Sequence, residues 1–225
     1  MRLGEWIRHF KPFSIYIHVV FFIGDIKFDI PSLRNLFPKL HRIDINCLKN
    51  EPNERDILNA QNLLRAFLSN VQNVGLFRVP LRENFSLQHI AMANLKHLEV
   101  DYRSKMDFVD ICSWNVESCM ISTFSDQMSI RDLNRFFKLW IKGLNPMLKE
   151  LSIYWPTEII PDWNVLLKGL NSIETEADGE EEDDEDDEER GAKKYIIKNV
   201  RGSNAIIKVM HADGDCGVVK FVLKN

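Results

Sequence analysis

The feature that most constrains this chain is a short apolar pattern that recurs along it. Each copy reads apolar-x-x-apolar-x-apolar, and its final spacing of two is typical of a strand with one buried face. Each copy begins 21 to 32 residues after the one before, which leaves room for one strand and one return segment. The five copies are Leu40/Ile43/Ile45, Val71/Val74/Leu76, Leu95/Leu98/Val100, Val116/Cys119/Ile121 and Leu148/Leu151/Ile153.

Apolar stretches between these copies have helical periodicity, at residues 57–67, 85–92 and 106–112. Right-handed strand-helix-strand crossovers place successive strands in parallel. We therefore predict an α/β fold, arranged as an irregular leucine-rich-repeat-like solenoid of strand-helix units. A doubly wound open sheet is the alternative, but it favours glycine-rich phosphate-binding turns, which the sequence lacks. The apolar run at residues 13–23 predicts a further, buried strand.

The segment 129–155, SIRDLNRFFKLWIKGLNPMLKELSIYW, predicts one helix, one turn and one strand. Ser129 is a good N-cap, Gly143 suits the left-handed residue after a helix, and Pro146 prevents the helix from resuming. Helical spacing turns the large apolar side chains inward: Ile130, Leu133, Phe136, Phe137, Trp140 and Ile141. Basic residues lie mostly opposite: Arg131, Arg135, Lys138 and Lys142. We interpret them as a solvated helix face.

The charge of the chain is very uneven. Its formal net charge is -4, yet residues 174–189 hold thirteen acidic side chains and no Lys or Arg, which leaves a basic body. Such a run repels itself and has nothing to bury. We therefore predict a repeat-like body at 1–172, an acidic disordered insertion at 173–191, and C-terminal strands at 192–225 that complete the domain as a short β-meander or hairpin.

Motifs that carry catalysis or bind a metal are missing. The six histidines are scattered singly, no pair of cysteines is spaced as CxxC, and no GxSxG, GxxxxGK[ST] or HExxH motif is present. The stretch HADGDCG at 211–217 lacks the later ligands of a calcium loop, and an Asp-Gly hairpin turn explains it better. We expect no catalytic residues, no metal and no cofactor, and so no enzyme.

Location and partners follow from the same composition. The four cysteines indicate a reducing compartment, and the run at 13–23 is too short to span a bilayer. No signal peptide is evident, so we expect a cytoplasmic or nuclear protein that meets no membrane. Nucleic-acid binding is not expected either, because periodicity assigns the aromatic side chains that would stack on bases to the core.

The segment 129–155 resembles the hallmark of the nematode F-box-associated domain of type 2, a D-L-N-x-F-x-K-x-W-x-x-G helix followed by N-P-x-L-x-x-L-x-I. The stretches LGEWIRHF and KFDIPSLRNLFPKLHRIDI upstream, and KKYIIKNVRGSNAIIKV downstream, are also similar to the family. The hallmark falls on Asp132, Leu133, Asn134, Phe136 or Phe137, Lys138, Trp140, Gly143, Asn145, Pro146, Leu148, Leu151 and Ile153.

The resemblance implies a non-catalytic protein-protein interaction domain. In this family an N-terminal F-box docks on the adaptor of an SCF-type (cullin-RING) ubiquitin ligase, and the associated domain is thought to capture the substrate protein. No leucine-proline-rich F-box precedes Trp6 here, so the adaptor is a doubtful partner for this chain. The alternative is a free-standing repeat scaffold or decoy that binds basic proteins through the acidic run. A hydrolase is a distant third.

Side-chain alternation predicts a recognition surface on the strand face opposite the apolar anchors. One row would hold Asp44, Gly75, Glu99, Met120 and Ser152, and the next Asn46, Phe77, Asp101, Ser122 and Tyr154. We expect both rows to face solvent, unless the C-terminal strands or the acidic insertion cover them. Apolar groups amid polar ones concentrate binding energy, so the predicted protein-binding residues are Phe77, Met120, Tyr154, Asp44, Asn46, Glu99 and Asp101.

Overall fold

The computed structural model describes residues 16–24, 29–37, 40–81, 86–102, 110–123, 129–157, 161–175, 192–212 and 216–224. The chain divides into two compact units, Met1–Asp101 and Tyr102–Asn225, and each is considered by itself. The acidic insertion lies outside the described residues from position 176 to 191, although its first three residues form strand β7 (Ile173–Thr175).

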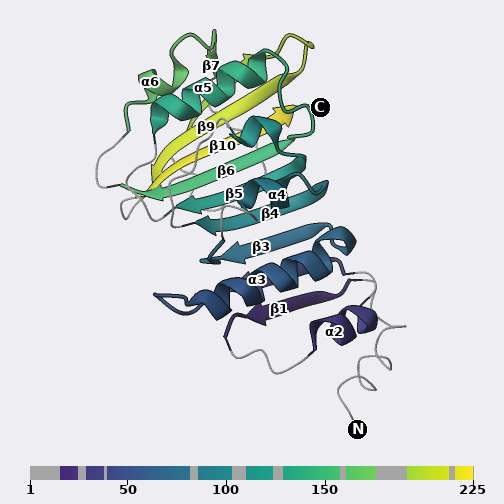
Figure 1. Ribbon diagram of the computed structural model, residues 1–225. Helices are drawn as coiled ribbons and strands as arrows, with labels where there is room; N and C mark the ends of the chain where they lie inside the picture. The colour runs from purple at the N-terminus through teal and green to yellow at the C-terminus, as the bar shows by residue number, and fades with distance from the viewer. Residues whose placement is uncertain are drawn as a thin grey trace. The chain divides into compact units, whose positions relative to one another are not determined.

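The first unit is built on four parallel strands that are hydrogen-bonded in chain order. They are β1 (His18–Phe22), β2 (Arg42–Asn46), β3 (Asn73–Phe77) and β4 (Leu95–Tyr102), whose last residue lies just past the unit boundary. The connections are α2 (Ile30–Leu36), α3 (Glu54–Phe67) with the 3-10 turn η2 (Leu68–Asn70), and α4 (Leu87–Ala91). Figure 1 shows α2 and α3 in front of these strands.

Helix α3 begins at a capping box. The Asn53 side chain accepts hydrogen bonds from the backbone N-H groups of Arg55 and Asp56, and the Asp56 carboxylate accepts one from the Asn53 N-H. These three bonds satisfy backbone N-H donors that the first helical turn cannot pair. At the other end of α3, Phe67 packs against Phe21 of β1 with ring centroids 5.6 Å apart. This contact fastens the helix to the sheet.

The second unit begins with two parallel strands, β5 (Val116–Thr123) and β6 (Glu150–Pro156). The sheet then continues antiparallel in the order β6-β10-β9-β8-β7. These strands are β10 (Cys216–Lys224), β9 (Asn204–Ala212), β8 (Lys193–Lys198) and β7. Its helices are the 3-10 turn η4 (Asp110–Ser113), α5 (Ile130–Ile141) and α6 (Trp163–Leu167).

Helix α5 confirms the inward assignment of its aromatic side chains. Leu133, Phe136, Phe137 and Trp140 are all buried. Phe137 and Trp140 meet Phe221 of β10, with ring centroids 5.8 and 5.0 Å apart. The cap is also as predicted, because the Ser129 hydroxyl accepts a hydrogen bond from the Asp132 N-H. Helix α5 therefore covers one face of the antiparallel strands.

The mixed α/β class is confirmed, and the five predicted strands appear as β2 to β6. The predicted C-terminal hairpin is the antiparallel pair β9 and β10. The strand predicted at residues 13–23 is present as β1, but its described part is buried only in part. Phe21 and Ile23 are buried, whereas Val20 and Phe22 point to the other face and are exposed, and β1 is the edge strand of the described sheet. Of the helix predicted at 106–112, the structure describes only η4.

Replacing Trp140 by alanine should destabilise the second unit by about 3–5 kcal/mol, the usual cost of deleting a buried indole. Its side chain is 2% exposed and rests on Phe221. Thermal unfolding of the full chain measures the loss. Met147→Ala removes a half-exposed side chain of the same unit and should leave the melting temperature nearly unchanged. Equal melting of both variants would contradict the packing of α5.

The α3 cap should make the first unit sensitive to acid. The Lys49 ammonium and the Asn53 N-H hold the pKa of Asp56 below its usual range. A lowered folded-state pKa stabilises the fold above about pH 4 and loses that effect as pH falls through the folded value. Urea unfolding at pH 7 and pH 3 should therefore show a smaller acid loss in Asp56→Asn than in the wild type. Glu51→Gln, an exposed neighbour, should keep the full acid loss.

Candidate protein-binding surface

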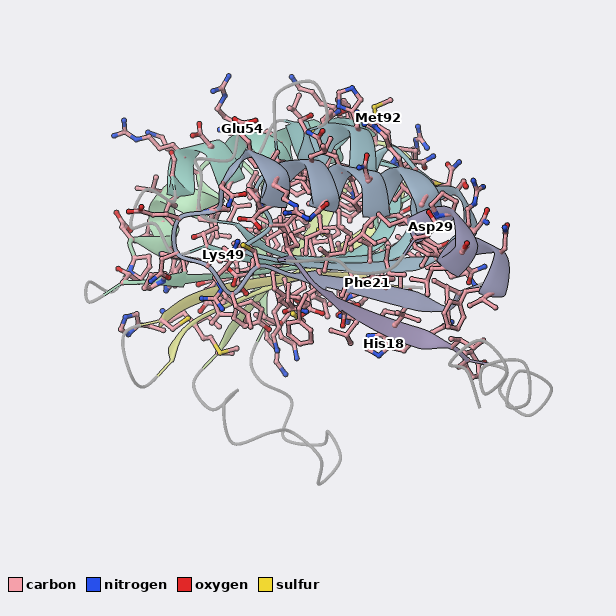
Figure 2. All side chains as sticks on the ribbon, turned by 60° about the horizontal axis from the view of Figure 1, so that its bottom comes forward. His18, Phe21, Asp29, Lys49, Glu54 and Met92 are labelled. Atoms are coloured by element: carbon pink, nitrogen blue, oxygen red, sulfur yellow. The ribbon has the colours of Figure 1, made fainter. Side chains whose placement is uncertain are left out.

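The first unit presents a polar sheet face on the side away from its helices. Figure 2 shows Glu54 and Met92 on the helix side and His18 on the opposite side of the strands. Strand register arranges this face in three rows that cross β1 to β4. The rows are His18-Arg42-Asn73-His97, then Val20-Asp44-Gly75-Glu99, then Phe22-Asn46-Phe77-Asp101. The predicted stacking of Asp44 with Gly75 and Glu99, and of Asn46 with Phe77 and Asp101, is confirmed.

A chain of charged contacts crosses this face. Arg42 Nε donates to Asp44 Oδ1 at 2.8 Å, and Arg42 Nη2 donates to Glu99 Oε2 at 2.5 Å. His18 Nε2 lies 2.8 Å from the other Asp44 oxygen. Burial lowers the pKa of Arg42, but the bonds to Glu99 and Asp44 raise it by more, so its pKa is raised overall. The guanidinium therefore stays charged and holds two carboxylates of different strands.

Gly75 makes the bond between Arg42 and Glu99 possible. Arg42 is on β2 and Glu99 is on β4, so the guanidinium must cross β3, where Gly75 is the residue in register between Asp44 and Glu99. A Cβ at position 75 would collide with Asp44 Oδ1, and it would lie 2.8 Å from Phe77 Cε2 and 3.0 Å from Arg42 Nη2. Because residue 75 has no side chain, the Arg42 guanidinium can cross β3 and reach Glu99.

The prediction that both rows face solvent is wrong at three positions. Asp44 is 8% exposed because Arg42 and His18 lie over it, and Gly75 is buried beneath the side chains of Asp44, Phe77 and Arg42. In the second unit Ser152 is buried between its strand neighbours Met120 and Lys220. The other predicted residues are partly exposed: Asn46, Phe77, Glu99 and Asp101 in the first unit, and Met120, Ser122 and Tyr154 in the second.

The second unit has a face of its own with a different chemistry. Met120 stands beside Ser152, and Ser122 beside Tyr154, as predicted from the alternation. Beyond β6 the same face continues onto the antiparallel strands, where Lys220, Lys208 and Lys194 are in register with Ser152. The predicted residues of this unit thus border a basic surface, whereas those of the first unit surround paired carboxylates.

Sequence reasoning missed two residues that shape the first surface, His18 and Arg42, and it placed Gly75 in the right row without giving it a role. A signal for Arg42 and Gly75 was present. Arg42 precedes Asp44 by two positions, so both side chains must share one face of β2. A glycine in the middle of a strand often marks a close approach of neighbouring groups, and Gly75 is such a case. The ion pair with Glu99 required the strand register, which the sequence does not contain.

The metal-ligating side chains of the described residues are dispersed. Among those residues, no group of three or more His, Cys, Asp or Glu side chains could hold a metal ion. Cys47 and Cys119 are buried, and burial raises the pKa of the Cys119 thiol. No helix within the described ranges is long and apolar enough to cross a membrane.

The polar residues of the 129–155 segment make structural bonds. The Asn134 side-chain amide donates to the carbonyls of Leu166 and Lys168 at 2.5 and 3.0 Å, which ties α5 to the end of α6. Asn145 donates to the Ile111 carbonyl at 2.6 Å and accepts from the Leu148 N-H at 3.2 Å. Both asparagines are buried. The two asparagines therefore stabilise the second unit, and other residues form its surface.

Gly143 completes this segment at the end of α5. Its φ is +89°, a left-handed conformation that glycine adopts without strain. A Cβ there would lie 3.3 Å from side-chain atoms of Val200 and Arg201, in the turn between β8 and β9. The Val200 N-H also donates to the Ile141 carbonyl at 2.8 Å. The glycine thus ends the helix and seats the C-terminal strands against it.

Comparison with known proteins finds a match for part of the chain. Residues 86–153, from just before α4 to the middle of β6, match the protein family described as F-box associated. The matched region includes α5 and the strands on both sides of it. The predicted resemblance to the F-box-associated family is confirmed over these residues.

A curated relative agrees with this assignment. It is the F-box associated domain-containing protein sdz-33 of Caenorhabditis elegans, 31% identical over 116 residues. The alignment covers 51% of this chain and 35% of the relative, so it spans about a third of that protein's length. No solved structure matches the chain.

Gly75→Ala should disturb the charged face of the first unit. The added methyl group would displace Asp44 and the ring of Phe77, and overpacking of this kind costs about 1–3 kcal/mol. Thermal unfolding measures the effect. Gly24→Ala is the matched control in the same unit, because a Cβ there has nothing within 4 Å. If the two variants melt alike, Arg42 does not depend on the absence of a side chain at Gly75.

Proposed function

We propose that this chain is a non-catalytic protein-interaction domain that captures substrate proteins for an SCF-type, cullin-RING ubiquitin ligase. The observation that carries the proposal is the match of residues 86–153 to the F-box-associated family. Ubiquitin transfer is performed by other subunits, and this chain contributes recognition. The compartment that fits such a role is the cytoplasm or the nucleus.

The arrangement of the strands supports this role. Parallel strands β2 to β4 in one unit, and β5 and β6 in the other, each follow a helical or 3-10 connection. We infer that these strand-helix units follow a leucine-rich-repeat-like plan, which gives extended sheet faces suited to binding proteins. Each unit has a sheet face away from its helices, and Phe77 in the first unit and Met120 and Tyr154 in the second are partly exposed there among polar side chains.

Binding energy at protein interfaces is concentrated in aromatic and other large side chains surrounded by polar ones. Phe77 lies beside Asn46 and Asp101 in register, and Tyr154 beside Ser122. We therefore assign Phe77, Met120 and Tyr154 as anchors for a protein partner, and Asp44, Asn46, Glu99 and Asp101 as its polar surroundings. Asp44 acts from beneath Arg42, whose orientation it fixes.

Proximity labelling with the full chain tests this proposal. Phe77→Ala combined with Tyr154→Ala should keep the thermal melt and lose most labelled partner proteins. Leu58→Ala combined with Met92→Ala is the matched control, because both side chains are exposed apolar groups outside the proposed surface. The control should keep the partners. Unchanged labelling in the Phe77/Tyr154 variant, with an unchanged melt, would reject this surface.

Co-purification distinguishes the ligase role from a scaffold or decoy role. Recovery of the cullin adaptor with the full chain supports the ligase role. The thirteen acidic residues between 174 and 189 favour the second candidate, in which the chain binds basic proteins such as histones. Replacing the acidic residues of 180–189 by serine should leave adaptor recovery intact. The decoy role would be favoured if the wild-type chain recovers basic proteins but no adaptor, and if the serine variant no longer recovers those basic proteins.

A further inference from the structure

A row of four apolar side chains crosses the antiparallel strands of the second unit. Ile173 of β7 is in register with Ile196, Ile196 with Ile206, and Ile206 with Val222 of β10. Ile173 is 68% exposed, Val222 is 38% exposed, and the two isoleucines between them are half-buried. We call this set, Ile173, Ile196, Ile206 and Val222, the apolar row.

The apolar row lies on the face away from α5. On β10, Phe221 packs against the aromatic side chains of α5, so Val222 next to it must point to the other side. The register then places Ile206, Ile196 and Ile173 on this side as well. Among the described residues, α5 and α6 belong to the opposite face, so neither of these helices covers the apolar row.

Lysines flank the apolar row on both sides. One side of the row holds Lys194, Lys208 and Lys220, each two positions along its strand from a residue of the row. The other side holds Lys198 and Lys224 at the same spacing. Residues two apart on a strand are about 6.8 Å apart, and neighbouring strands lie about 4.8 Å apart. The described residues of β8, β9 and β10 include no Asp or Glu. We call these five lysines the lysine flanks.

The boundaries of this face are also defined. Val218 and Met210, beyond the first lysine flank, are buried. On β6 the register partner of Val222 is Glu150, whose carboxylate accepts a hydrogen bond from the Ser118 hydroxyl. The exposed strip is therefore an apolar row about three strand spacings long, with positive charge along both sides.

Lysines placed directly opposite each other on adjacent strands repel, and an anion bound across them relieves that repulsion. Lys194, Lys208 and Lys220 also have interactions within the chain, so a bound anion exchanges with those interactions. Exposed apolar side chains rimmed by charge are characteristic of interaction sites. The two features occur together on one strip, and one partner segment can satisfy both.

We propose that this strip binds an acidic segment of a partner protein in which apolar side chains are flanked by carboxylates. The apolar side chains cover the apolar row, and the carboxylates pair with the lysine flanks. This inference rests on the proposed function, since it gives the chemistry of a captured protein. Residues 176–191 of the chain itself carry the negative charge that would pair with the lysines. They contain no apolar side chain larger than Ala177, however, so they cannot cover the apolar row.

Peptide binding to the purified full chain tests the proposal. The probe is a fluorescein-labelled twelve-residue peptide that alternates pairs of Glu and Leu, followed by fluorescence anisotropy at several salt concentrations. A second probe has Ser in place of every Leu. The Glu/Leu peptide should bind at least about tenfold more tightly than the Glu/Ser peptide, and its affinity should fall as salt rises.

Variants locate the binding. Lys208→Gln combined with Lys220→Gln should weaken binding of the Glu/Leu peptide about tenfold, as expected for two partly exposed ion pairs. Arg131→Gln combined with Lys142→Gln removes the same charge from exposed positions on α5 and should change nothing. If the first variant melts early, Lys198→Gln with Lys224→Gln tests the outer flank at exposed positions.

Four results would overturn the proposal. In the first, the flank variants bind the Glu/Leu peptide as well as the wild type does, and in the second, the two peptides bind equally well. In the third, anionic vesicles or single-stranded DNA bind more tightly than the Glu/Leu peptide and depend on the lysine flanks. In the fourth, the peptide binds only after the acidic residues of 180–189 are replaced by serine. The last result would mean that the chain's own acidic residues occupy the strip. Adaptor co-purification is a separate measurement, so failure of the strip leaves the ligase role standing, and loss of the adaptor leaves the strip standing.

Discussion

The surfaces of this protein depend on the two-residue alternation of side chains along its strands. On β2, Ile43 and Ile45 are fully buried on the helix side, and this fixes Arg42, Asp44 and Asn46 on the other side. On β10, Phe221 under α5 has the same effect on Lys220 and Val222. A shift of one residue in either strand would exchange the core with the surface. Burial of the apolar anchors therefore also determines which polar groups meet a partner.

Much of the fold could be predicted from local patterns. The triplet Leu40/Ile43/Ile45 located β2, and the stripe that ends at Trp140 located α5 together with its cap at Ser129. Both depend on residues close together in sequence, where period and capping are decisive. The edge position of β1 could not be seen in the same way. An apolar run predicts a strand, but whether a second strand lies beside it depends on distant parts of the chain.

The candidate surfaces were predictable only in part, for the same reason. Alternation gave the right row for Asp44, but its burial follows from Arg42 reaching across Gly75 to Glu99, a contact between strands 57 residues apart in sequence. The lysine flanks could not be predicted from local patterns. Lys194, Lys208 and Lys220 become neighbours only through the antiparallel register of three strands. The 129–155 segment, which identified the family, turned out to hold the second unit together through Asn134 and Asn145.

The position of β10 has a consequence for how the second unit can assemble. This strand is the latest of the unit in sequence, yet it lies between β6 and β9 and pairs with both. Residues 157–212 must therefore be synthesised before β6 acquires its second neighbour, and its pairing edge stays open during that time. Contacts between residues this distant form slowly, and open strand edges pair with other chains. During synthesis, the edge of β6 therefore remains open to aggregation and to chaperones until the nascent chain extends past residue 216.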